Sequence, residues 1–235
     1  MEIVICHLTR MRAPNICIAG IEPVSGRHIR PVLEMDQLSS NFLESRGGCV
    51  NMANALETGP LRLVQQRPEA EDHLFDSSNL RKIGPLEPDE FWKLLLKHKK
   101  DSLDAIFGDA LFERGSSRVV RPNTGNASLG LIMPKKTPEI MINVFNGRKR
   151  IRVRFFDNDT RSFLSLTDLR FYENDTDNPS DAAVENVSQR LTAGVKVILS
   201  LGLTRAWRKP DEIEEFHWLQ VNNVHLEDDP AWGVQ

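Results

Sequence analysis

Short apolar and alternating runs, separated by turn residues, dominate the first quarter of the chain. Gly26, free to adopt positive φ, lies in one of these turns, and Pro14 lies in another. The pattern predicts five short strands, at residues 2–10, 15–22, 28–33, 49–55 and 61–64. About five strands in so short a segment are enough for a small barrel that closes on itself.

Polar residues and helix signals replace the strand pattern over residues 68–117. Pro88 opens a predicted helix with acidic residues in its first turn and lysines in its last, which matches the helix macrodipole. Gly108 ends a second short helix expected over 102–107. We expect this segment to be a helical connector.

The clearest hairpin of the chain lies at 139–156, because Asn146-Gly147 is the preferred pair for a type I′ turn. On its second strand, every other residue is an arginine, and the residues between them are apolar except the first: Arg148, Arg150, Arg152 and Arg154 alternate with Lys149, Ile151, Val153 and Phe155. Successive side chains of a strand point to opposite faces, so the four arginines are expected to share one face.

Later elements complete the predicted fold class. Further strands are expected over 162–166, 195–203 and 216–226, and a helix over 181–191. This order favours an α+β fold, predominantly antiparallel β, over a parallel α/β sheet. We expect a β module over residues 1–67, the connector over 68–117, and a second β module with one inserted helix over 118–235.

One strand–turn–strand pattern occurs twice. Leu8-Thr9-Arg10 ends the first predicted strand, and Leu203-Thr204-Arg205 ends a strand near the C-terminus. A second arginine follows within three residues in each copy, Arg12 in the first and Arg208 in the second, and the chain then returns as a strand. The repeat indicates two related small β modules.

Charge is unevenly distributed along a mildly acidic chain. The net charge is -3, yet residues 135–154 hold seven Lys or Arg against Glu139 alone, and residues 211–229 hold seven acids with no Lys or Arg. A locally basic face on an acidic protein suits selective anion contacts better than coating of nucleic acid in bulk.

Composition also indicates the environment of the protein. No apolar run approaches the roughly 20 residues of a bilayer span, and the start of the chain lacks the features of a signal peptide. Cys6, Cys17 and Cys49 are odd in number and lack metal-ligand spacing. We therefore expect a reduced cytoplasmic protein without a membrane partner.

Motifs along nearly the whole chain resemble a bacterial family described as dual OB-domain proteins. They are Leu8-Thr9-Arg10-Met11-Arg12, Gly20-Ile21, Gly26-Arg27, Arg30-Pro31-Val32, Glu71-Asp72-His73, Ser128-Leu129-Gly130, the 167–173 run, Gly202-Leu203-Thr204-Arg205 and the 218–226 run. The resemblance implies two small OB-like β-barrels and a nucleic-acid- or nucleotide-binding role, with a place in bacterial defence or conflict systems. It supplies no catalytic residues.

The arginine strand is the strongest binding candidate. An OB barrel binds single-stranded nucleic acid by combining a cationic groove with aromatic platforms. Arg148, Arg150, Arg152 and Arg154 are expected to contact phosphates. The alternative is the solvated outer face of an amphipathic strand, which any antiparallel sheet can show.

The arginines of the repeat are a second candidate. Arg10, Arg12, Arg205 and Arg208 lie just past strand ends, and the planar guanidinium suits phosphate or carboxylate. The alternative is that each pairs with an acid of its own fold, such as residues 211–215.

Aromatic and amide side chains provide candidates for base recognition. Trp207, between two arginines, is expected to stack on a base, with Tyr172 and Trp218 as further platforms. Polar side chains over 220–225 can read base edges, or instead satisfy buried backbone at a bulge; they are Gln220, Asn222, Asn223 and His225.

Two other function classes stay open. A metal-dependent nuclease or phosphodiesterase would use Asp72, His73 and other histidines brought together by folding, from among His7, His28, His217 and His225. None of these has metal-ligand spacing, so we expect no metal ligands, no cofactor and no catalytic residues. A protein-interaction adaptor would dock a basic partner through residues 211–215.

Overall fold

The computed structural model describes residues 1–145, 147–173, 178–210 and 212–232. Seven strands from the N-terminal half form one sheet in the order β5-β6-β3-β2-β1-β4-β7. Neighbouring strands are antiparallel except β3 and β6, which run parallel. The strands are β1 (Glu2–Arg10), β2 (Ile16–Ile21), β3 (His28–Val32), β4 (Asn54–Glu57), β5 (Arg62–Leu63), β6 (Asp72–Leu74) and β7 (Arg81–Pro85).

The C-terminal half contains two further sheets. A five-stranded sheet has the order β10-β14-β15-β9-β8, and β11, β12 and β13 form a three-stranded sheet. A parallel bridge between Leu166 and Val221 links the end of β13 to β15. The strands are β8 (Phe112–Arg114), β9 (Ser117–Val120), β10 (Leu129–Ile132), β11 (Glu139–Phe145), β12 (Arg148–Asp157), β13 (Thr160–Ser165), β14 (Val197–Leu203) and β15 (His217–Leu226).

The helices begin and end close to the positions that the sequence signals predict. They are α1 (Pro88–His98), α2 (Leu103–Phe107) and α3 (Asp181–Thr192). Pro88 occupies the first turn of α1, and the hydroxyls of Ser102 and Ser180 cap α2 and α3 by accepting backbone N–H groups. Short 3-10 turns lie at Ser40–Phe42, Glu44–Arg46, Ser77–Asn79, Gly108–Ala110 and Leu169–Phe171.

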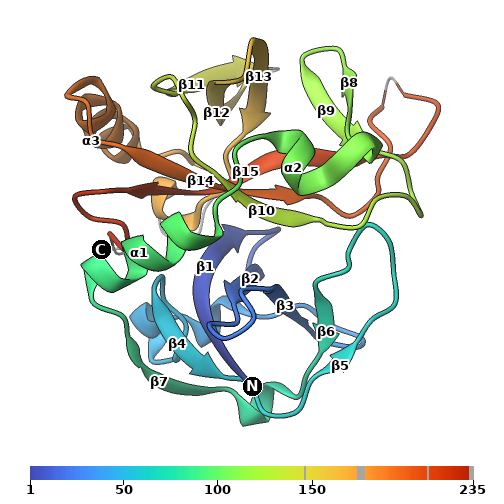
Figure 1. Cartoon of the computed structure of the whole chain (residues 1–235), viewed down its shortest axis with the longest axis vertical. Coiled ribbons are helices and arrows are strands. Elements are labelled where there is room, and N and C mark those ends of the chain that lie inside the picture. The colour runs from blue at the N-terminus through green and yellow to red at the C-terminus, as the bar shows by residue number, and fades with distance from the viewer. Residues whose placement is uncertain (146, 174–177, 211, 233–235) are drawn as a thin grey trace.

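Figure 1 shows two halves, with the N-terminal strands below and the C-terminal strands above. The interface between the two halves is here called the seam. Helix α1 lies on one flank of this seam, and α2 lies above it on the near side. The fold is mainly antiparallel β with few helices, as expected. However, the first and last strands of each sheet do not pair with each other, so neither half forms a closed barrel within the described part of the chain.

The segment predicted as a helical connector also contains strands. β6 pairs with β3 and β7 pairs with β4, so both belong to the N-terminal sheet. Neither strand was predicted, because β6 has three residues and β7 is solvent-exposed along nearly its whole length, so neither shows an apolar alternation. The module boundaries at residues 67 and 117 stay a prediction.

The repeated sequence pattern forms the same local structure in both halves. β1 pairs with β2 and β14 pairs with β15, each as an antiparallel hairpin. Each hairpin contains a register shift, next to Cys6 in the first and next to Asn222 in the second. A β-bulge of this kind leaves one residue without a partner and re-aims neighbouring side chains.

Apolar packing joins the two halves. The core of the N-terminal half includes Leu131, Leu169 and Ile198, all of which come from later in the chain. A second core lies among the C-terminal strands and α3. Because later residues complete the first core, the two halves are packed against each other by buried apolar contacts.

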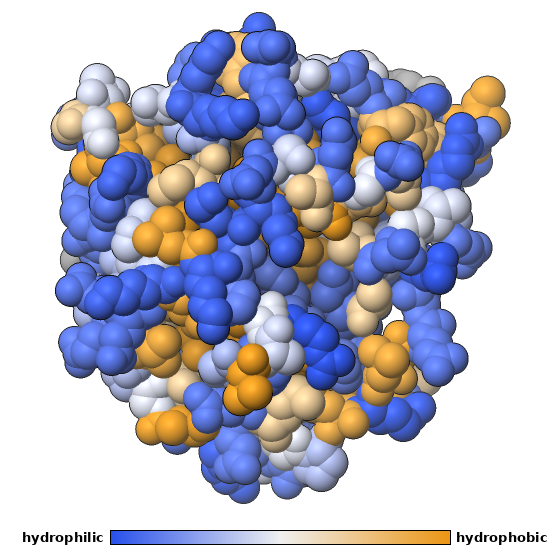
Figure 2. Space-filling view, in the orientation of Figure 1, coloured by the Kyte–Doolittle hydropathy of each residue, from blue (hydrophilic) through white to orange (hydrophobic). Residues whose placement is uncertain are grey.

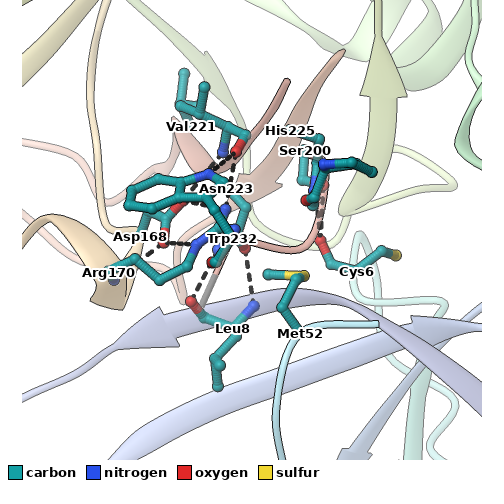
Figure 3. A network of polar contacts seen from close by, with 12 residues as sticks. Cys6, Leu8, Met52, Asp168, Arg170, Ser200, Val221, Asn223, His225 and Trp232 are labelled. Carbon is teal, nitrogen blue, oxygen red and sulfur yellow. Dashed lines mark hydrogen bonds and ion pairs between the residues drawn. The ribbon is translucent and has the colours of Figure 1, made fainter. Parts of the chain in front are cut away.

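A buried polar network crosses the same seam (Figure 3). The side chain of Asn223 bonds to the backbone of Leu8, and the hydroxyl of Ser200 donates to the carbonyl of Cys6 at 2.8 Å. The fully buried Asp168 and Arg170 form an ion pair whose carboxylate also accepts the Val224 N–H. Hydrogen-bonded buried polar groups specify one arrangement of the halves.

Candidate nucleic-acid interface

The arginine strand has the two-faced structure that its sequence predicts. On β12, Ile151, Val153 and Phe155 are buried in the C-terminal core. Arg148 and Arg150 are exposed and Arg152 and Arg154 are half-buried on the other face. The alternation therefore places four guanidinium groups along one side of the strand.

The cations of this strand differ in their partners. Arg154 donates to Glu139 at 2.7 Å, and Lys149 lies 3.2 Å from the carboxylate of Asp181. Arg152 donates instead to the hydroxyl of Ser165 and the carbonyl of Phe163. Within the described residues, neither Arg150 nor Arg152 forms an ion pair, so their charge is available to a ligand.

Lys209, between β14 and β15, adds a third cation at this place. Burial lowers the pKa of Lys209, the positive charge of Arg152 lowers it further, and Arg150 adds to the shift against the opposing effect of Glu212. Burial and then Arg150 also lower the pKa of Arg152. Arg150, Arg152 and Lys209, here named the basic cluster, thus repel one another, and an anion bound among them would be stabilised.

An exposed tryptophan lies beside the basic cluster. The Lys209 ammonium lies 3.3 Å from the centroid of the Trp218 ring, and the Trp207 ring lies 6.1 Å from that of Trp218. Trp218 is buried and donates its indole N–H to the Trp207 carbonyl, whereas Trp207 is 42% exposed. Trp207 is therefore an aromatic surface held in place by a buried neighbour, which suits stacking on a base.

Two arginines of the repeat, Arg10 and Arg205, contact groups of the protein. Arg10 stacks over the ring of Tyr172 at 4.0 Å. Arg205 pairs with the buried carboxylates of Asp72 and Glu69 rather than with the 211–215 segment. Arg10 and Arg205 therefore both have partners within the fold.

Arg12 and Arg208 are exposed, so they remain available at the surface.

Tyr172 is 6% exposed and its hydroxyl donates to the Leu166 carbonyl. A buried ring covered by Arg10 offers no face to a base, so Tyr172 supports packing in this structure.

The amide residues of β15 lie in the seam. Gln220 is half-buried and donates to the Asn222 side chain at 3.2 Å. Asn222, at the bulge, lies 3.1 Å from Nδ1 of His7, and His225 lies between Ser200 and the Pro230 carbonyl. These contacts match the structural alternative stated for this strand, in which amides satisfy buried groups at a bulge.

A buried charge cluster surrounds Asp72, the acid of the proposed hydrolase couple. Asp72 contacts Arg30 and Arg205, whereas the ring of the next residue, His73, bonds to the Glu71 carbonyl at 2.8 Å. Glu71 itself accepts from the backbone and hydroxyl of Ser128. Asp72 is thus neutralised by two arginines and does not act on His73, so the geometry gives no support to the hydrolase alternative.

Glu69 belongs to this cluster and was not singled out from the sequence. Burial alone raises the pKa of its carboxyl, but His217 Nδ1 and Arg205 Nη1, at 3.2 and 3.3 Å from Oε1, lower the pKa to about 2. Lys209 was also missed, although it directly follows Trp207 and Arg208 in the chain. Two consecutive cations directly after a tryptophan were the available signal.

Two acids of the proposed docking segment form ion pairs within the fold. Glu212 accepts from the guanidinium of Arg114, with Nε 3.0 Å away, and Glu214 pairs with Arg121 at 2.7 Å. Asp211 lies outside the described residues.

Figure 2 shows hydrophilic residues over most of one face, with apolar residues in small separate groups. That face therefore lacks the large apolar patch of a stable protein interface.

Comparison with known proteins identifies one family. The family model described as Dual OB-containing domain matches residues 1–224. No curated protein matches the chain. In the described part of the chain, the helices are too short or too polar to cross a bilayer.

Proposed function

Because this chain belongs to the dual OB-containing domain family, we propose that it binds single-stranded nucleic acid through the C-terminal half. The observation that carries the proposal is the basic cluster beside the exposed Trp207. OB modules use this combination, in which cations contact the phosphates and an aromatic ring stacks on a base.

The proposed ligand is single-stranded because of the way Trp207 is presented. A ring at the surface can stack on an unpaired base, whereas paired bases within a duplex are already stacked on their neighbours. The half-buried Arg152 and Lys209 would contact the backbone of the strand next to that base. A free nucleotide carries the same two chemical groups and is the smaller ligand of the same proposal.

Binding of fluorescent oligonucleotides across a salt series tests the proposal. Single- and double-stranded DNA and RNA are compared for the wild type, for Arg150→Gln/Lys209→Gln, and for a control, Arg62→Gln. Arg62 is also exposed but lies on β5 in the N-terminal half. We expect tighter binding of single strands, and a salt slope reduced by about one for each lost phosphate contact in the double variant only.

Two results would contradict the proposal. One is absence of binding at low salt for both oligonucleotides and nucleotides. The other is an equal loss in the Arg62 control, which would indicate nonspecific attraction. The expectations of a cytoplasmic location and of a role in bacterial defence stay predictions that this experiment leaves untouched.

A further inference from the structure

A cysteine and two histidines converge at the seam, away from the basic cluster. Cys6 and His7 are consecutive residues of β1, and His28 begins β3. In a regular strand, consecutive side chains point to opposite faces. Here the register shifts from Ile5 opposite Gly20 to His7 opposite Ala19, so Cys6 lies at a β-bulge. The bulge brings potential donor atoms of Cys6, His7 and His28 within 4.8 Å of one another.

The two imidazole rings are arranged like a pair that shares a metal ion. Their centroids are 5.2 Å apart and their planes are inclined by 74°. When two imidazoles bind one tetrahedral zinc ion with Zn–N distances of about 2.0–2.1 Å, their ring centroids are roughly 5 Å apart. Donor atoms of a zinc tetrahedron are separated by roughly 3.3–3.8 Å, so closing the present site needs shifts of about 1 Å. Rotation of the side chains can supply such shifts.

Unpartnered nitrogen atoms distinguish these histidines from ordinary core residues. Nε2 of His7 and Nε2 of His28 are both buried and have no hydrogen-bond partner among the described residues. A buried polar atom without a partner destabilises the fold, and a ligand that satisfies both nitrogens removes that cost. His7 is nearly fully buried, at 1% exposure. A bound cation would satisfy both nitrogens at once.

Asn222 contacts the other ring nitrogen of His7. Its amide nitrogen Nδ2 lies 3.1 Å from Nδ1 of His7, and its Oδ1 accepts a hydrogen bond from Gln220 at 3.2 Å. For Nε2 of His7 to ligate a metal, Nδ1 must carry the ring proton, so metal binding requires the Asn222 amide to turn over and accept that proton through Oδ1. A metal-bound histidine generally donates its other N–H in this way.

A pocket gives the cluster a route to solvent. His28 lines a pocket of about 300 Å³, together with His98, Lys100 and Glu71. Its lining residues come from β3 and, across the seam, from α2 and β10. Three protein ligands leave one position of a tetrahedral ion open, and the pocket has room for a water or an anion there.

We propose that Cys6, His7 and His28 bind one zinc ion at the seam. A thiolate and two imidazoles are donors that favour zinc and cobalt over magnesium or calcium. In Figure 3 the Cys6 carbonyl faces Ser200 while the sulfur atom points away from that contact, so the backbone can hold β14 while the side chain ligates. His7 and His28 were among the histidines considered from the sequence, but their spacing predicts no metal site, because the bulge and the neighbouring strand bring them together with Cys6. The proposal does not depend on nucleic-acid binding.

Metal content and cobalt spectroscopy of the full chain test the proposal. Wild-type protein is equilibrated with zinc, dialysed and analysed for bound metal, and a parallel sample is loaded with Co²⁺. We expect one ion per chain, visible absorption typical of tetrahedral cobalt, and a thiolate-to-cobalt charge-transfer band. Cys6→Ser should abolish that band, whereas Cys17→Ser and Cys49→Ser, which alter the other cysteines, should keep it.

A second readout covers the case in which Cys6→Ser fails to fold. His28 is half-buried, so His28→Gln should fold, which circular dichroism checks. Zinc should raise the melting temperature of the wild type and leave that of His28→Gln unchanged. Wild-type protein that retains far less than one ion per chain would overturn the proposal. So would a charge-transfer band that survives Cys6→Ser or that Cys17→Ser removes.

Discussion

The side chain of Asn223 pairs with both backbone groups of Leu8 across the seam. The Leu8 N–H donates to Oδ1 at 2.8 Å, and Nδ2 donates to the Leu8 carbonyl at 3.0 Å. All of these atoms are buried, and the two residues are 215 positions apart in the chain. One carboxamide thus takes the place of a neighbouring strand, and it fixes the position of β15 relative to β1.

Replacing Asn223 should destabilise the whole fold. Asn223→Ala leaves a buried N–H and a buried C=O of Leu8 unpaired, each at a cost of about 1–3 kcal/mol. We expect a loss of roughly 2–5 kcal/mol in the free energy of unfolding, measured by urea denaturation. Asn15→Ala is the control, because the Asn15 side chain bonds to Gln37 at the surface. Equal losses in the two variants would contradict this role of Asn223.

Replacing Arg170 should also destabilise the whole fold, because its guanidinium neutralises the buried carboxylate of Asp168. Its guanidinium contacts Asp168 at 2.7 and 2.8 Å, both side chains are fully buried, and it also donates to the carbonyls of Val224 and Trp232. Arg170→Met leaves the buried negative charge of Asp168 without a partner, which should lower the free energy of unfolding by about 3–5 kcal/mol. Adding Asp168→Asn should recover part of that loss in a double-mutant cycle.

A surface ion pair provides the control for Arg170. Arg190 pairs with Asp228 on the outside of the C-terminal half. Arg190→Met should therefore cost about 0–1 kcal/mol in the same denaturation assay. Similar effects of Arg170→Met and Arg190→Met, or an Asp168→Asn cycle without coupling, would contradict this role of Arg170.

Acid should weaken the fold through Glu69. Its folded-state pKa of about 2 lies below the ordinary value of 4.5, so the unfolded chain takes up a proton first as the pH falls. The contribution of Glu69 is complete above pH 4.5 and is lost as the pH falls towards 2. Since one pKa unit corresponds to about 1.4 kcal/mol, the full contribution is about 3 kcal/mol.

Stability measured from pH 6 to pH 2.5 checks the Glu69 prediction. Glu69→Gln should be less stable than the wild type at pH 6 and should show a shallower dependence on pH below 4.5. Glu57→Gln is the control, because Glu57 is exposed on β4. An unchanged slope in Glu69→Gln would show that other carboxylates dominate acid unfolding.

Local signals in the sequence account for the elements that were predicted. The turn pair that contains Gly147 marks the β11–β12 hairpin, and Pro88 and Ser102 mark the starts of α1 and α2. β6 could not be found in this way. Its three residues pair with β3, and Asp72 lies 42 residues from its partner Arg30, so only the tertiary fold defines that strand.

The same distinction applies to the candidate site. The arginine face of β12 follows from alternation within one strand, which the sequence shows directly. The engagement of Arg205 with Asp72 and of Asn222 with His7 spans 133 and 215 residues. No local sequence pattern shows which residues make contacts over such separations. Side chains available to a ligand therefore could not be distinguished, from the sequence, from side chains that contact the other half of the protein.

Trp207 should contribute to affinity without contributing to the salt dependence. Trp207→Ala removes a stacking surface but no charge, so it should weaken binding of single-stranded oligonucleotides by about 1–3 kcal/mol. The slope of log affinity against log salt should stay unchanged, whereas Arg150→Gln should reduce it. Trp207→Phe should retain part of the affinity, because a smaller ring still stacks. Because Trp207 is 42% exposed, melting temperatures should change little. A reduced salt slope in Trp207→Ala would mean that the tryptophan orders the basic cluster instead of stacking on a base.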